Sequence, residues 1–319
     1  MLMVAASLAG ARVFSSTHWL GIPVALLGAV FLALGTIYQG RGVEAGGRET
    51  SLGALMRRPV WLAGTLMLGV AVVLQLTALR FSPLMVVQPI GAFALIVTAL
   101  VAMRTSRRRP NPRRVLAIGL CVAGIGAFVT LAALSAQDVQ ITDRHLLTIL
   151  IVLAFALAAA LVLSRRVRHR PNPALSTASA GILYGFVATL AKAVIGRMVQ
   201  GDFALLSLAG LAGLVVALVL GAGFVQKAHV GGSDELVVAG LTVVDPMVAV
   251  TVGITVLGEA DTAPPAAYVG FLAAGAAAIA GVWLIASTQT DASVEGSLRQ
   301  SGQVQEPEAS GRHARGPVG

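Results

Sequence analysis

The chain has 319 residues, of which 56% are hydrophobic and only 12% are charged, and its mean hydropathy is +0.85. A soluble domain of this length cannot bury so much apolar surface, so the composition predicts a protein that lies in a lipid bilayer. The net charge of +9 does not indicate nucleic-acid binding, because the basic runs are short and no aromatic side chains are interleaved with them.

Nine apolar segments follow one another along the chain, and each is long enough for a helix to cross the bilayer, which takes about 20 residues. They are Trp19–Tyr38, Pro59–Leu79, Ser82–Met103, Arg114–Leu134, His145–Leu163, Ala174–Met198, Phe203–Lys227, Ser233–Leu257 and Pro265–Ala286. Barrel strands would be about 10 residues long and would alternate polar with apolar residues, which none of these segments does. The predicted fold class is therefore an all-α integral membrane protein with nine transmembrane helices.

The two ends of the chain differ from the spans. Residues 1–18 begin with an apolar stretch, Met1–Phe14, which is short and contains Arg12. We therefore expect an extracytoplasmic surface segment rather than a tenth span or a secretory signal. From Thr288 the chain is polar, and we expect residues 288–319 to form a disordered cytoplasmic tail.

Basic residues are concentrated in every second loop. One set of loops and termini holds Arg41, Arg48, Arg57, Arg58, Arg104, Arg107, Arg108, Arg109, Arg113, Arg114, Arg165, Arg166, Arg168, Arg170, Lys227, Arg299, Arg312 and Arg315. The opposite set holds Arg12, Arg80, Arg144 and Arg197. Because loops rich in Lys and Arg stay in the cytoplasm, we expect a multi-pass plasma-membrane protein whose N-terminus is outside and whose C-terminus is cytoplasmic.

The sequence repeats itself at an offset of 151 positions, which separates Gln75 from Gln226. The same offset pairs Ser82 with Ser233, Val86–Val87 with Val237–Val238, Val97 with Val248, Gly119 with Gly270, Ala123 with Ala274 and Gly124 with Gly275. A rival register pairs Val86–Pro89 with Val243–Pro246; it fits better locally but fails at the next helix.

The copies have opposite directions, because the third span runs from outside to inside and the eighth runs back. We therefore expect two inverted repeats (4+5): four helices in residues 19–134 and five in residues 135–287. Inverted repeats are typical of secondary transporters, in which one half moves against the other around a central site.

Three short motifs carry a resemblance to a known family. The segment Ala239–Glu259, which ends in Leu-Gly-Glu, resembles the end of an EamA-type repeat, and the Gly-rich helix Ala266–Ala286 follows it. Ser82–Ala92 and Gln226–Ala228 are similar to the Thr-Pro-Leu-Gly-Ala and Asn-Lys-Ala motifs of NIPA-type magnesium transporters. The chain thus resembles the drug/metabolite transporter superfamily and, within it, the NIPA-type branch. The first half departs from the pattern, because Arg108 stands where the second half has Glu259.

Asp245 is the one acid deep inside a predicted span, about 12 residues and roughly 18 Å along its helix, near mid-bilayer. Pro246 removes a backbone donor, so a kink there would free a carbonyl and direct the carboxylate into a cavity. Because an ionisable group in a span is costly, Asp245 is a functional candidate that couples transport to a proton or cation. Alternatively, it satisfies the loosened turn beside Pro246.

Three more polar residues lie inside spans. Lys192 either attracts an anionic substrate group or pairs with Asp245, or its side chain snorkels to the outer surface. Gln75 and Gln88 either line the path or form interhelical hydrogen bonds. The predicted substrate path comprises Asp245, Pro246, Gln88, Pro89, Gln75 and Lys192.

Other motifs indicate structure rather than chemistry. The small-residue stretch Gly181–Gly185 predicts close helix packing, because no strand precedes it as in a phosphate loop. The histidines are scattered, and none pairs with an acid in a recognisable motif, so we expect no enzyme.

Three functions remain in order of preference. The first is a transporter that moves a small solute by alternating access through a site between the inverted repeats. The second is a NIPA-like transporter of Mg²⁺ or another divalent cation with Asp245 as metal ligand, although one acid makes a thin site for a hard cation. The third is a non-transporting membrane scaffold, which has no need of an inverted repeat.

These functions fix the expected partners. They are the lipid bilayer and a small-molecule or cation substrate, without nucleic acid, and a homodimer is left open. No cofactor is expected, apart from Mg²⁺ or H⁺ as a transported or coupling ion.

Overall fold

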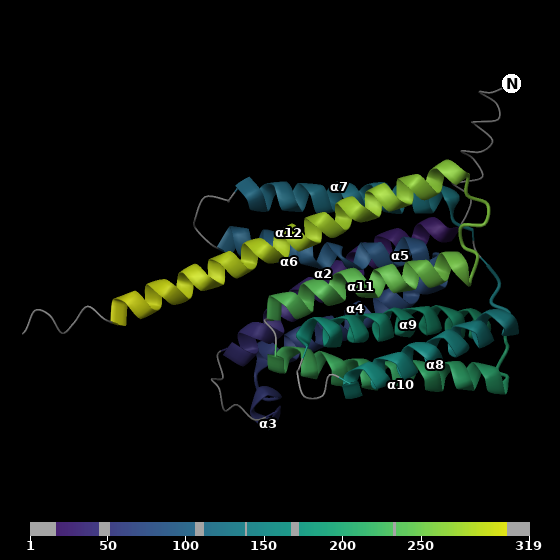
Figure 1. Cartoon of the computed structure of the whole chain (residues 1–319), viewed down its shortest axis with the longest axis horizontal. Coiled ribbons are helices and arrows are strands. Elements are labelled where there is room, and N and C mark those ends of the chain that lie inside the picture. Colours follow the sequence, from purple (N-terminus) through teal and green to yellow (C-terminus); the bar gives the residue numbers. More distant parts are fainter. Residues whose placement is uncertain are drawn as a thin grey trace, which may run out of the picture.

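The structure is a computed structural model that describes residues 17–44, 52–105, 112–137, 139–166, 172–231 and 234–304. Its elements are η1 (Thr17–Leu20), α2 (Gly21–Glu44), α3 (Leu52–Leu55), α4 (Pro59–Phe81), α5 (Leu84–Gly91), α6 (Phe93–Thr105), α7 (Pro112–Ser135), α8 (Asp143–Arg166), α9 (Pro173–Val199), α10 (Leu205–Gly231), α11 (Asp234–Thr255) and α12 (Pro265–Val304). The described chain is therefore an all-helical bundle (Figure 1).

The predicted transmembrane helices are confirmed. Within the described ranges, nine segments are helical, long enough and apolar enough to cross a membrane, and each matches one predicted span. The third consists of two helices, α5 and α6, which are separated by Ala92.

The helices alternate in direction, so the bundle has two ends (Figure 1). One end is where α4, α7, α9 and α11 finish, and it carries Arg80, Arg144 and Arg197. We call it the Arg-poor end. At the other end α2 and α10 finish, and we call it the Arg-rich end. Its described basic residues include Arg41, Arg57, Arg58, Arg104, Arg113, Arg165, Arg166 and Lys227.

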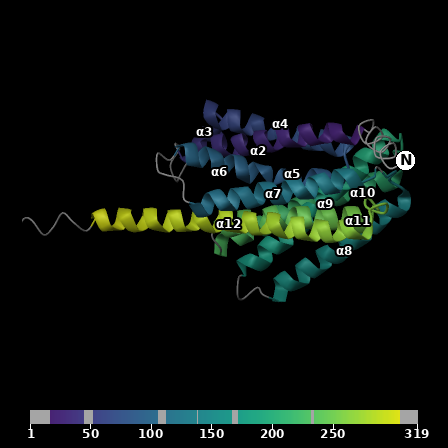
Figure 2. The same cartoon turned by 90° about the horizontal axis from the view of Figure 1, so that it is seen from above.

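Helix α9 is the central helix, since it packs against α4, α5, α8, α10 and α11. Two thirds of the residues in the apolar 18-residue stretch of α9 are buried. The same share is 17% for α8, which is also the most hydrophobic span. Seen from above, α4 and α8 lie at opposite edges of the bundle (Figure 2). A helix as exposed and apolar as α8 is stable where lipid covers it.

Glycines allow the closest helix contacts, as the sequence predicted for Gly181–Gly185. A Cβ atom at Gly185 of α9 would lie 2.8 Å from the carbonyl oxygen of Asp245 on α11. Likewise, a Cβ atom at Gly124 of α7 or Gly281 of α12 would collide with the backbone of the facing helix. Small residues thus bring whole backbones together, as is common in membrane bundles.

The pairing of helices is similar in the two halves. α2 packs along α4 and α9 along α10, while α7 packs along α12. The paired third and eighth spans, α5–α6 and α11, run in opposite directions (Figure 1). This is what inverted repeats would give, but the division into residues 19–134 and 135–287 stays a prediction.

Of the two prolines expected in the substrate path, Pro89 lies close to an interruption of its span and Pro246 does not. α11 passes through Pro246 as one helix, whereas the third span is interrupted at Ala92, three residues after Pro89. The Ala92 amide donates to the Pro89 carbonyl, and the Leu95 amide donates to the Ala92 carbonyl, so the backbone tightens there. Pro89 and Gly91 weaken this turn, because one lacks a donor and the other lacks a side chain.

The ends of the chain differ from the expectation in one respect. α12 continues to Val304, so residues 288–304 are helical where a disordered tail was expected. No proline interrupts the sequence before Pro307, which explains how the helix persists past the apolar segment. Residues 1–16 and 305–319 lie outside the described residues, as do Arg48, Arg107, Arg108, Arg109, Arg168 and Arg170.

Candidate functional site

A cavity of about 330 Å³ lies between α2, α4, α5 and α11, and we call it the polar cavity. It is lined by Gly28, Ala29, Leu32, Ala71, Val72, Gln75, Gln88, Gly91, Ala92, Leu241, Thr242, Asp245 and Pro246. Four of the six residues predicted for the substrate path, Gln75, Gln88, Asp245 and Pro246, therefore share one cavity although they come from three different helices.

Asp245 supplies the one carboxylate in the wall of the polar cavity. It lies in the middle of α11, on a stretch that packs tightly against Gly181 and Gly185 of α9. Its Oδ1 atom is buried and has no hydrogen-bond partner within the part of the chain that the structure describes. Such an oxygen is costly in an apolar bundle, and a bound cation or an added proton would relieve that cost.

Gln75 and Gln88 add amide groups to the same cavity. Gln88 belongs to the short helix α5 and is buried, whereas Gln75 on α4 is half-buried. Each amide has a carbonyl oxygen, so the cavity combines a carboxylate with two neutral oxygen donors. Oxygen ligands of this kind suit a hard cation such as Mg²⁺.

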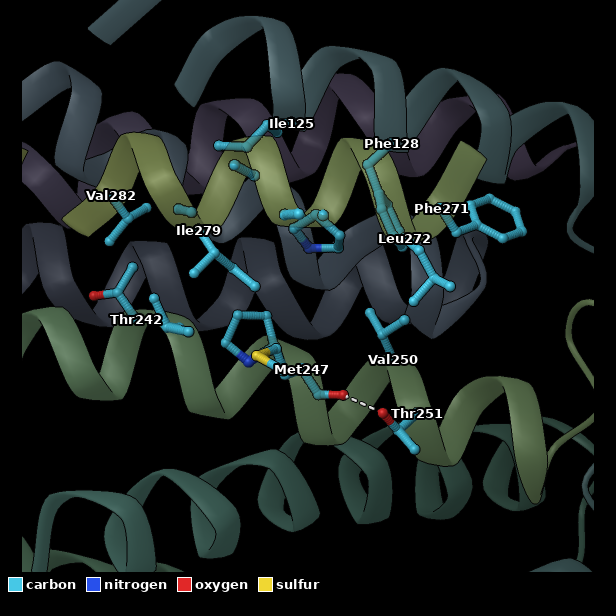
Figure 3. A pocket seen from close by; sticks show the side chains of 17 residues that line it. Ile125, Phe128, Thr242, Met247, Val250, Thr251, Phe271, Leu272, Ile279 and Val282 are labelled. Carbon is cyan, nitrogen blue, oxygen red and sulfur yellow. Dashed lines mark hydrogen bonds between the residues drawn. The ribbon is translucent and has the colours of Figure 1, made fainter. Parts of the chain in front are cut away.

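A second cavity of about 340 Å³ lies beside the first and is apolar (Figure 3). Its walls come from α5, α7, α11 and α12, with Ile125, Phe128, Val250, Phe271 and Ile279 among them. The Thr251 hydroxyl inside it donates to the Met247 carbonyl of its own helix at 2.7 Å and offers little to a ligand.

The two cavities share part of their walls. Ala92, Thr242 and Pro246 line both cavities, while Pro89 lines only the apolar one. The break in the third span and the proline of the eighth therefore meet at the boundary between the cavities. Pro89 is thus separated from the polar residues with which it was predicted to act.

Lys192 is buried inside the bundle and does not reach the outer surface. It lines neither cavity and is only 5% exposed, so the snorkelling interpretation is wrong. Its Nζ atom donates to the carbonyl oxygens of Leu79 at 2.9 Å and Ser82 at 3.0 Å, where α4 ends. The unpaired carbonyls at a helix C-terminus are a better partner for a buried ammonium than distant solvent is.

Glu259 was not among the residues that the sequence predicted for the substrate path, although it bonds to the helix α5 that lines the polar cavity. Its two carboxylate oxygens accept hydrogen bonds from the amides of Leu84 at 2.7 Å and Met85 at 2.8 Å, at the start of α5. Gly258 adopts φ +70°, which lets the chain turn so that Glu259 points inward. The Leu-Gly-Glu motif was the available signal, but it was used only as a family marker.

The described residues contain no cluster of three or more His, Cys, Asp or Glu side chains that is able to hold a metal ion. A cation at Asp245 would therefore have one anionic ligand, with amide oxygens and water completing its shell. The side chains of Asp234 and Glu235, the two acids at the start of α11, lie outside the described residues.

Comparison with known proteins gives a family match in the first half of the chain, from η1 to α8. Residues 16–168 match the family model of the magnesium transporter NIPA. An uncharacterized protein of Corynebacterium glutamicum is 27% identical over 251 residues, which cover 76% of this chain and 86% of that protein. The probable magnesium transporter NIPA5 of Arabidopsis thaliana is 26% identical over 130 residues, 39% of this chain and 33% of that protein. No solved structure matches.

Proposed function

We propose that this chain, whose residues 16–168 match the model of the NIPA-type magnesium transporter family, carries Mg²⁺ or a similar divalent cation across the membrane through the polar cavity. The family supports a membrane cation transporter; the ion and the path are our proposal. The observation that carries it is the buried Oδ1 atom of Asp245, which has no hydrogen-bond partner in the described chain and belongs to the one acid in the cavity wall.

A single carboxylate is enough if the ion keeps most of its water. Mg²⁺ dehydrates reluctantly and is often held by one or two carboxylates with several waters. Six waters at about 30 Å³ each occupy roughly 180 Å³, which fits within a cavity of about 330 Å³. Asp245 would supply the charge, and Gln75 and Gln88 would accept or donate hydrogen bonds to the water shell.

The origin of the cavity walls supports alternating access as the mechanism of transport. One side of the cavity comes from α2, α4 and α5, and the other from α11. If these belong to two inverted repeats, relative movement of the repeats exposes Asp245 first to one side of the membrane and then to the other. The distribution of basic residues supports an orientation with the Arg-rich end in the cytoplasm, and we propose the plasma membrane as the location.

A small organic solute is the second candidate, and the apolar cavity favours it. An amphipathic cation would place its charge at Asp245 and its apolar part across the shared wall at Pro246. An apolar cavity offers no ligand to Mg²⁺, which binds oxygen atoms.

The test is Mg²⁺ flux into proteoliposomes that contain the purified protein, with Mg²⁺-sensitive and pH-sensitive dyes inside. We expect uptake that Asp245→Asn abolishes, while Asp261→Asn, in an exposed turn, leaves it unchanged. A pH change in step with uptake would identify H⁺ as the coupling ion.

Two results would contradict the proposal. Unchanged Mg²⁺ flux in Asp245→Asn would remove Asp245 from the path. Absence of Mg²⁺ flux in folded wild-type protein would turn the search to organic cations.

A further inference from the structure

The connection between α4 and α5 is held at both of its ends by side chains from the second half of the chain. Lys192 of α9 donates to the carbonyl oxygens of Leu79 and Ser82, at the end of α4. Glu259 accepts from the amides of Leu84 and Met85, at the start of α5. We call these two side chains and their four hydrogen bonds the clamp.

The charges of the clamp match the helix ends that they contact. The carbonyls at the C-terminus of α4 carry partial negative charge and meet an ammonium group, and the amides at the N-terminus of α5 carry partial positive charge and meet a carboxylate. Glu259 is 1% exposed and Lys192 is 5% exposed, so water does not weaken these bonds. Charge-assisted hydrogen bonds in such surroundings are among the strongest in proteins.

Backbone hydrogen bonds also fix the loop that carries Glu259. The Glu259 amide donates to the Gly253 carbonyl at 3.0 Å, and the Gln137 amide donates to the Glu259 carbonyl at 2.9 Å. The loop between α11 and α12 is therefore anchored to α11 and to the segment that follows α7. Because this fixed loop bonds to the backbone of α5, it restrains the position of the helix independently of the side chains of α5.

The clamp lies between the polar cavity and the Arg-poor end. The first turn of α5, Leu84 to Val87, is at most 1% exposed and fills this region. The rest of the same helix, with Gln88 and Gly91, lines the cavity. α5 is thus both a cover over the cavity and part of its wall.

We propose that the clamp keeps the Arg-poor entrance of the polar cavity closed, and that this entrance opens when Lys192 releases the end of α4 and Glu259 releases the start of α5. The interruption of the third span at Ala92 supplies the hinge, because α5 has only eight residues and is able to tilt there without unwinding α6. Glu259 and Lys192 are positioning residues in this scheme, since neither lines the cavity. This inference rests on the transport function proposed above. Its test measures accessibility and does not depend on transport.

The experiment measures accessibility, so it needs no knowledge of the substrate. Cys121, the single cysteine in the sequence, is replaced by Ala, and Gly91→Cys is introduced as a reporter in the cavity wall. A Cβ atom at Gly91 would meet nothing within 4 Å, so the reporter fits without strain. Intact cells and inside-out vesicles then expose opposite ends of the bundle to a membrane-impermeant cationic thiol reagent.

We expect Glu259→Gln and Lys192→Met each to raise the labelling rate from the Arg-poor side at least about tenfold, because each removes charge-assisted hydrogen bonds. Labelling from the Arg-rich side should stay the same or fall. Asp261→Asn and Lys227→Met are matched controls, since both residues are exposed and remain outside the clamp, and they should change neither rate.

The two clamp variants keep the proposal falsifiable even if one fails to fold. Size-exclusion chromatography of the purified variants identifies the folded ones. Unchanged labelling from the Arg-poor side in a folded clamp variant would overturn the gate. Increased labelling in a protein that carries no Mg²⁺ would support the gate and count only against the proposed substrate.

Discussion

Asp245 combines features that are rarely found together in a membrane span. It is the one acid in the wall of a cavity, its Oδ1 atom has no partner among the described residues, and its helix is held tightly by the glycines of α9. The helix contacts fix where the carboxylate lies, while the cavity leaves room for what it binds. This is the arrangement expected of a preformed site for a cation that arrives with water.

The water shell leads to a prediction about inhibitors. Hexaamminecobalt(III) has the size and shape of a hydrated magnesium ion but does not exchange its ligands. If the cavity binds a largely hydrated ion through Asp245, this complex should compete with Mg²⁺ and raise its apparent KM without lowering the maximal uptake rate. Uptake into proteoliposomes at increasing inhibitor concentration measures this.

A matched variant separates the cavity from nonspecific effects of a trivalent ion. Gln88→Leu removes a polar wall residue and should weaken the inhibition several-fold, because one amide loses its contact with the shell. Lack of competition at concentrations far above the KM for Mg²⁺ would indicate direct coordination by the protein instead.

At the scale of whole helices, α9 and α11 form the contact that supports the site. A Cβ atom at Gly185 would lie 2.7 Å from the Val248 Cβ and 2.8 Å from the Asp245 carbonyl oxygen. Both neighbours belong to α11, which also borders α5 and α12. The glycine face of α9 therefore sets how close Asp245 lies to the centre of the bundle.

Gly185→Ala should accordingly lower both stability and transport. Overpacking by one methyl group typically costs about 1–3 kcal/mol, and here it displaces the turn that carries Asp245. Gly223→Ala on α10 is the control, because its Cβ would meet nothing within 4 Å; it should be neutral or stabilise the helix by about 0.5–1 kcal/mol. Thermal unfolding followed by size-exclusion chromatography measures both, and equal stability of the two variants would contradict the packing argument.

The sequence predicted the spans because apolar length is a property of the residues themselves, and all nine are present in the described chain. It did not predict which proline interrupts a helix. Val86-Val87-Gln88-Pro89 and Val243-Val244-Asp245-Pro246 are similar locally, yet only the first lies beside a break. One reason is tertiary and one is local: α11 packs along the glycines of α9, whereas Gly91 lies two residues after Pro89 and weakens the helix.

The residues of the cavity and of the clamp differ in how visible they are in the sequence. Polar residues in apolar spans stand out, so Gln75, Gln88 and Asp245 were identified as candidates and do share a cavity. Lys192 also stood out, but its partners are backbone carbonyls, which no pattern of side chains reveals. Glu259 follows α11 in a loop and bonds to amides 174 and 175 positions away, a distance that only the fold closes.

For the molecule as a whole, the basic residues and the clamp lie at opposite ends of the bundle. The described loops at one end carry Arg41, Arg57 and Arg58 among others, whereas Glu259 and Lys192 lie toward the end with few arginines. Cytoplasmic loops are the ones enriched in Lys and Arg, so the clamp would face the outside of the cell. A closed outer entrance would leave the cavity shielded from external solvent until the clamp releases.

This orientation is testable with two single cysteines in the Cys121→Ala background. Asp261→Cys lies in an exposed turn at the Arg-poor end, and Gly53→Cys lies on α3 near the Arg-rich end, where its Cβ meets nothing within 4 Å. If the positive-inside rule sets the topology, an impermeant maleimide added to intact cells should label Asp261→Cys and spare Gly53→Cys. Inside-out vesicles should give the reverse, because an odd number of spans between these positions fixes them on opposite faces. Labelling of Gly53→Cys in intact cells would invert the assignment, so that Glu259 and Lys192 would guard the cytoplasmic entrance.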